Sequence, residues 1–159
     1  MYTNSLVKSL SQIRSSFFIF LLIFVSANIA TAQTSRHTRV TISVNSDQIK
    51  VEAELSAPST SWSFRNAYAG VLGIAERVDD FRAITGSGQD ARATKIATGE
   101  FRSALDATRI AYQVRLSEIN AASVSHVSWL SGDYGVLMFA DLLPQDLTNL
   151  SVDFELPNG

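Results

Sequence analysis

The sequence predicts a small, mainly β domain: an antiparallel β-sandwich with one short helical segment, preceded by a cleaved signal peptide. Several stretches alternate apolar and polar residues with a period of two, which is typical of half-buried strands. Clusters of turn-forming residues separate these stretches at short intervals, as in antiparallel sandwiches and barrels. An unbroken apolar run near the N-terminus stands apart from both patterns. A chain of 159 residues is long enough for a single core.

The first 32 residues have the parts of a secretory signal. Lys8 and Arg14 give a positive flank, residues 17–25 (FFIFLLIFV) form the apolar run, and Ala30-Thr31-Ala32 supplies the small residues of a cleavage site. The run is shorter than the roughly 20 apolar residues of a membrane-spanning helix. We therefore expect residues 1–32 to be removed, and residues 33–159 to form a domain exported to the periplasm or the exterior. An uncleaved anchor is the alternative, because the polar flank of residues 35–37 suits either.

The clearest strands come first. Residues 37–46 place Val40, Ile42 and Val44 on one face, and residues 48–55 repeat the alternation. A cluster of turn-forming residues at 45–47 joins them, which predicts an antiparallel hairpin. Pro58 is expected to end the second strand.

A change of period follows the hairpin. Between residues 61 and 84 apolar side chains recur at three and four residues, which predicts an amphipathic helix, with a strand over about residues 80–84. Gly70 and Gly73 each weaken this helix by roughly 1 kcal/mol relative to alanine.

The remaining segments favour short strands. Turn signals at 86–88, 98–99 and 131–133 separate predicted strands over residues 92–96, 100–103, 107–119, 127–130 and 135–142. A last strand carries Leu150, Val152, Phe154 and Leu156 and is stopped by Pro157.

The composition excludes several classes of function. Without cysteine there is no disulfide framework, thiol nucleophile or thiolate metal site. Removal of Lys8 and Arg14 leaves eleven basic residues against fifteen acidic ones, a net charge near −4. Arg115 is the last basic residue, so we expect no nucleic-acid partner, which would need a clustered basic face.

No catalytic, cofactor-binding or metal-binding residue is predicted. His37 and His126 are the only histidines, and neither begins an HExxH motif. Ser125 and Ser128 flank His126, but a serine nucleophile also needs a placed base and an oxyanion hole, and no G-x-S-x-G motif is present. The carboxylates of residues 76–80 lack the spacing of a calcium loop.

Two apolar sets are candidate contact surfaces. An aromatic cluster could face a peptide or glycan, although aromatic residues of a small domain more often lie in its core; it consists of Trp62, Phe64 and Tyr68. A second apolar set could be the surface that a partner domain covers; it consists of Leu137, Phe139, Leu142 and Leu143.

Three segments together resemble the N-terminal domain of the glycyl aminopeptidase family of metallopeptidases, which carry a PDZ domain. They are WSFRNAYAGVLGIAERVDDFRAITGSG, ATRIAYQVRL and LTNLSVDFELPNG. The matching positions form a V-x-x-F-x-A strand with a glycine turn, a Y-x-V strand and a closing Leu-Pro and Gly; they are Val78, Phe81, Ala83, Gly86, Tyr112, Val114, Leu156, Pro157 and Gly159.

The resemblance implies a β-rich, non-catalytic module that, in the family, precedes a thermolysin-like domain bearing HExxH. That motif and the PDZ domain are missing from this chain, so the resemblance carries over no catalytic residue. We expect a non-enzymatic, exported accessory domain, as a truncated product or a stand-alone relative, that contacts a catalytic metallopeptidase domain or a peptide. The alternative is a stand-alone periplasmic or secreted module that binds a peptide or glycan. Neither requires a cofactor.

Overall fold

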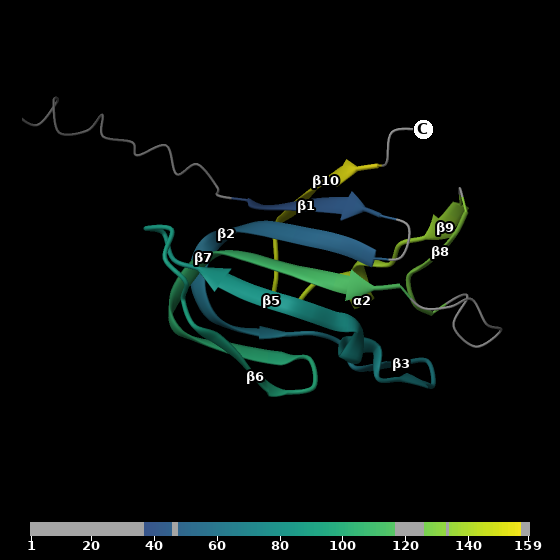
Figure 1. The fold of residues 1–159 in the computed structure, drawn as a ribbon, viewed down its shortest axis with the longest axis horizontal. Coiled ribbons are helices and arrows are strands. Elements are labelled where there is room, and N and C mark those ends of the chain that lie inside the picture. The colour runs from purple at the N-terminus through teal and green to yellow at the C-terminus, as the bar shows by residue number, and fades with distance from the viewer. Residues whose placement is uncertain (1–36, 46–47, 117–125, 133, 157–159) are drawn as a thin grey trace, which may run out of the picture. The chain divides into compact units, whose positions relative to one another are not determined.

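The computed structural model describes residues 37–45, 48–116, 126–132 and 134–156 (Figure 1). The predicted signal peptide lies outside these residues, so its cleavage stays a prediction. Within the described ranges, no helix is long and apolar enough to cross a bilayer.

A six-stranded sheet forms the centre of the domain, in the order β10-β1-β2-β7-β5, with β6 also paired to β7 (Figure 1). Two-stranded hairpins, β3-β4 and β8-β9, lie outside it. The prediction of a mainly β domain is therefore confirmed. The strands of the main sheet are β1 (Thr38–Val44), β2 (Gln48–Ser63), β5 (Val78–Ile84), β6 (Ala93–Ala97), β7 (Glu100–Arg115) and β10 (Leu150–Glu155).

The first predicted hairpin is confirmed. β1 and β2 pair antiparallel, with Ile42 opposite Val51 and Val44 opposite Ile49. All four side chains are buried, whereas the alternate residues of β2 face solvent. The period of two therefore predicted both the pairing and the face that turns inward.

β2 and β7 are longer than the sequence predicts. β2 passes through Pro58 and continues to Ser63, with register shifts against β7 between Glu54 and Ser61. Proline is tolerated there because a shifted register does not require its missing N–H. The two predicted strands over 100–103 and 107–119 are one strand, β7, as far as Arg115. Both long strands bend, so the ends that carry Trp62 and Phe101 pack in the same core as β1 (Figure 1).

The helix predicted between residues 61 and 84 is wrong. The chain forms the end of β2, then a hairpin of β3 (Ala67–Tyr68) and β4 (Val71–Leu72), a single 3-10 turn η1 (Ile74–Arg77) and β5. Ala69, Gly70 and Gly73 have φ values of 48°, 85° and 74°. These left-handed conformations interrupt a right-handed helix, so the two glycines act as turn residues.

The C-terminal part corrects the predicted antiparallel topology. β8 (Trp129–Ser131) and β9 (Tyr134–Val136) form the expected hairpin. The predicted strand over 135–142 ends at Val136, and the one short helix of the described chain, α2 (Phe139–Leu142), follows. β10 is present as predicted but pairs with β1 in parallel; the long stretch of chain between the two strands allows this, whereas a tight hairpin would not. The main sheet is therefore mixed and open, and the described residues form one bent sheet where a two-sheet sandwich was expected.

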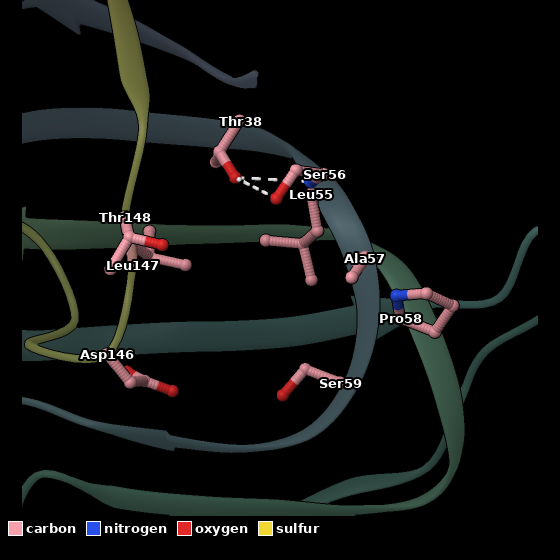
Figure 2. Close-up of a pocket in the computed structure, with 9 residues that line it drawn as sticks. All are labelled: Thr38, Leu55, Ser56, Ala57, Pro58, Ser59, Asp146, Leu147 and Thr148. Carbon is pink, nitrogen blue, oxygen red and sulfur yellow. Dashed lines mark hydrogen bonds between the residues drawn. The ribbon is translucent and has the colours of Figure 1, made fainter. Parts of the chain in front are cut away.

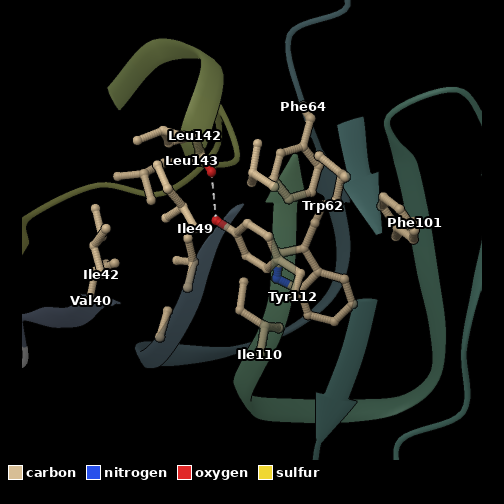
Figure 3. Close-up of a cluster of buried hydrophobic side chains, with 14 of the residues drawn as sticks. Val40, Ile42, Ile49, Trp62, Phe64, Phe101, Ile110, Tyr112, Leu142 and Leu143 are labelled. Atoms are coloured by element: carbon tan, nitrogen blue, oxygen red, sulfur yellow. Dashed lines mark hydrogen bonds between the residues drawn. The ribbon is translucent and has the colours of Figure 1, made fainter. Parts of the chain in front are cut away.

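The core combines an aliphatic part under β1 and β2 with an aromatic part under β7 (Figure 3). Phe81 and Phe101 stack with ring centroids 4.2 Å apart, and Trp62 lies 5.3 Å from Phe81. Tyr112 lies at the centre, where its hydroxyl donates a hydrogen bond of 2.8 Å to the carbonyl of Leu142. Burial raises the pKa of Tyr112 well above its ordinary value. This bond ties α2 to the sheet.

Candidate functional site

The predicted aromatic surface is divided between core and exterior. Trp62 is 1% exposed and Phe64 is 3% exposed. Phe64 packs edge-on against Tyr112, with ring centroids 5.0 Å apart (Figure 3). Tyr68 is 44% exposed. The three residues therefore share no surface, because β2 continues to Ser63 and carries Trp62 inward.

Tyr68 has its own neighbours at the exposed β3-β4 hairpin. The guanidinium of Arg65 lies over its ring, 5.1 Å from the centroid, and the ring of His126 meets it edge-on at 6.0 Å. Leu72, across the hairpin, is among the most exposed apolar side chains. A cation, an imidazole and an aromatic ring together can stack against a planar or sugar-like ligand.

Among the described residues, the serine near His126 in the sequence makes structural contacts. No group of three or more His, Cys, Asp or Glu side chains gathers among them. Ser128, which the sequence places near His126, donates its hydroxyl hydrogen to Asp141 Oδ1 at 2.8 Å and accepts the Met138 N–H at 2.7 Å. Its oxygen is therefore used in structural hydrogen bonds.

A buried polar network fixes α2. Asp141 Oδ2 accepts hydrogen bonds from Arg77 Nη2 at 2.6 Å and from the Ser128 backbone N–H at 2.7 Å. Arg77 also donates from Nε to the carbonyl of Ile74. The side chains of Arg77 and Asp141 are only 11% and 3% exposed. The network joins η1, the segment before β8, and α2, which the sequence alone gave no reason to bring together.

The predicted domain-contact surface is also divided. Leu142, the last residue of α2, and Leu143, which follows it, are buried in the core, and Leu137 packs partly against the core. Phe139 is 46% exposed. Only Phe139 of the four is therefore well placed to contact a partner.

Phe139 instead joins an apolar surface that sequence reasoning missed. Its ring stacks on that of Phe154 of β10, with centroids 6.0 Å apart and planes inclined by 20°. Phe139 also lines a shallow depression with Leu150, Arg65 and Pro144. We define the α2–β10 patch as the exposed apolar residues of these two elements and the residue after β10, namely Phe139, Leu150, Phe154 and Leu156. The period of two in the last strand predicts that Leu150, Phe154 and Leu156 share one face. It does not predict whether another layer of the protein covers that face.

A second hollow lies where β2 bends (Figure 2). It is a pocket of about 200 Å³ between that bend and the loop before β10. Thr38 Oγ1 donates to Ser56 Oγ at 3.1 Å and accepts the Ser56 N–H at 3.1 Å, and Asp146 lines the far side. These hydrogen bonds stabilise the bend, and both hydroxyls of the lining pair, Thr38 and Ser56, are used in them.

Comparisons with known proteins give one structural likeness. Neither protein families nor curated proteins gave a match to this chain. Among solved structures, the fold is similar to part of an aminopeptidase N family protein from Idiomarina loihiensis, with a TM-score of 0.59 and 12% sequence identity. The likeness covers 76% of this chain and 22% of that protein, so this chain corresponds to a minor part of its length. At this identity the likeness is one of fold.

Proposed function

We propose that this chain is a non-catalytic, exported accessory module. It resembles the N-terminal domain of a glycyl aminopeptidase-like metallopeptidase and packs on a catalytic domain. The observation that carries the proposal is the fold likeness, because 76% of this chain corresponds to only 22% of an aminopeptidase N family protein. The α2–β10 patch supports it, since contiguous exposed apolar side chains are typical of interaction surfaces.

Two experiments test the proposal. The DNA downstream of the codon for Gly159, and the genes beside it, should encode a domain with HExxH. That domain, produced separately, should form a stoichiometric complex with this chain in size-exclusion chromatography. If no complex forms at micromolar concentrations of the two proteins, the accessory role is contradicted.

The non-catalytic part of the proposal has its own measurement. The purified chain, supplied with Zn²⁺, should not hydrolyse glycyl or alanyl p-nitroanilide above the rate in buffer. Hydrolysis that survives repurification and is abolished by a chelator would refute it.

A stand-alone module that binds a peptide or glycan is the second candidate, and the exposed cluster of Tyr68, Arg65 and His126 favours it. In this case Tyr68→Ala should weaken binding on a glycan or peptide array by about fivefold or more, because stacking on an aromatic ring contributes roughly 1 kcal/mol or more. Tyr134→Ala is the matched control, since Tyr134 is also exposed but lies on β9. Equal binding by both variants and the unaltered chain would exclude this cluster.

A further inference from the structure

The strands at the two ends of the main strand order, β10 and β5, differ in how they are protected. β5 has a register shift between Asp79 and Arg82, and Asp80 has a φ of 51°. Such a bulge with charged residues hinders pairing with another strand. The register of β10 with β1 is unbroken from Leu150 to Glu155. Within the described ranges no strand pairs with its other side (Figure 1), so β10 presents a regular edge.

The apolar face of the sheet continues onto β10 without full cover. Phe154 lies beside Ile42 of β1 in the parallel register. Ile42 is fully buried, whereas Phe154 is 46% exposed. Leu150 precedes Phe154 by four residues and therefore lies on the same face of the sheet. It lies beside the buried Thr38 but is itself exposed. The cover formed by α2 therefore stops at Phe139.

The opposite face of β10 is acidic at its C-terminal end. Asp153 and Glu155 alternate with the apolar row, and Glu155 accepts a hydrogen bond from Ser43 Oγ at 2.5 Å. The nearest basic residue on β1, Arg39, pairs with Ser151 at the other end of the strand. Among the described residues neither carboxylate forms an ion pair, so basic side chains on an added strand would meet negative charge on this face.

We propose that β10 accepts, by strand addition, an extended segment of the peptidase domain that accompanies this module. In that segment apolar side chains alternate with lysine or arginine. The inference rests on the proposed function for the identity of the partner. The open edge supplies main-chain hydrogen bonds, and the depression beside Phe139 and Leu150 receives an apolar side chain. In a longer chain, a domain after Leu156 would begin at the end of the same row.

A synthetic peptide tests the edge without the partner. The probe alternates valine and lysine and is blocked at both ends; one control replaces lysine with glutamate, and another groups the valines into one block. In hydrogen-exchange measurements on the intact protein, the probe should slow exchange of β10 amides by at least about tenfold, while the controls change it little. Unchanged exchange at millimolar probe would overturn the inference.

Matched variants locate the binding surface. Phe154→Asp should abolish protection by the probe, whereas Leu105→Asp, on β7 and equally exposed at 46%, should retain it. If circular dichroism shows that Phe154→Asp is unfolded, Leu156→Asp replaces it, because Leu156 is 68% exposed and lies beyond the strand. If Leu105→Asp and the β10 variant, Phe154→Asp or Leu156→Asp, bind the probe equally, the apolar face of β10 has no role in binding.

The HExxH domain separates this inference from the proposed function. A complex that protects β10 supports both. A complex in which β10 exchanges as in the free protein refutes strand addition alone. Protection by the peptide without any complex refutes the accessory role and with it the partner assigned here. Protection that rises with protein concentration and needs no added partner would identify a second copy as the occupant and overturn the inference.

Discussion

Replacement of Asp141 by asparagine tests whether the buried network holds α2 in place. The carboxylate accepts three hydrogen bonds, one from Arg77 and two from Ser128. Asparagine keeps one acceptor oxygen and turns an NH₂ group towards the remaining donors. The substitution also removes the negative charge beside the guanidinium of Arg77, whose side chain is only 11% exposed.

The cost follows from burial. Removal of one partner from a buried ion pair costs about 3–5 kcal/mol, because the other charge stays desolvated and loses the Coulomb attraction of the pair. Small domains are stable by only about 5–15 kcal/mol, so the variant should lose a large share of its stability. For a domain of this size, such a loss lowers Tm by on the order of 10–20 °C.

Urea unfolding followed by circular dichroism measures the change. Asp79→Asn is the matched control, because Asp79 pairs with Arg115 at 2.5 Å but the two side chains are 45% and 61% exposed. An exposed pair contributes less than about 1 kcal/mol, so the control should unfold close to the unaltered protein. Equal losses in the two variants, or a loss below about 1 kcal/mol for Asp141→Asn, would refute the role assigned to the network.

Two further predictions concern the core. Because burial raises the pKa of Tyr112 above 10.0, the unfolded chain loses this proton first at high pH. The contribution of Tyr112 to stability should therefore be constant below about pH 10 and be lost as the pH rises above it. Tyr112→Phe should remove this contribution, so that the free energy of unfolding changes less with pH in this range. The substitution should also lower the free energy of unfolding by about 1–2 kcal/mol, because the Leu142 carbonyl loses the hydrogen bond from the Tyr112 hydroxyl. Gly99 has a φ of 75°, and the Cβ of Gly99→Ala would lie 2.6 Å from the Cβ of Ala75. Gly88→Ala is the control, because Gly88 also has a positive φ but has open space, so only the backbone strain of roughly 1 kcal/mol is expected. Gly99→Ala should lower the free energy of unfolding by more than this control, and equal losses in the two variants would contradict the contact with Ala75.

Local alternation predicted the strands well because it reports which residues of a strand turn inward. Val40, Ile42 and Val44 are buried as expected, and the strand that contains them forms the predicted antiparallel hairpin with β2. The pattern fails between residues 61 and 84, where apolar spacing matched a helix. Left-handed backbone at Gly70 and Gly73 forms turns there, and a count of apolar spacing does not take this local freedom of glycine into account.

The candidate surfaces were harder to predict because exposure depends on what lies above a residue. Trp62 and Phe154 are both aromatic residues in alternating strands, yet one is 1% and the other 46% exposed. Trp62 is covered because the bend of β2 brings it under Phe81. Phe154 lies where the layer above the sheet ends. Composition and spacing are alike in the two cases, so only the path of the chain distinguishes core from surface.

The position of α2 decides how much of β10 is covered. Asp141 anchors the helix to Arg77 and Ser128, and Tyr112 anchors it to the sheet through Leu142. Phe139, at the start of α2, is thereby held against Phe154, leaving the rest of the row open. These buried hydrogen bonds thus determine how much of β10 is left exposed for a partner. It follows that Asp141→Asn should disturb binding at β10 as well as stability, although the substituted residue lies in the interior.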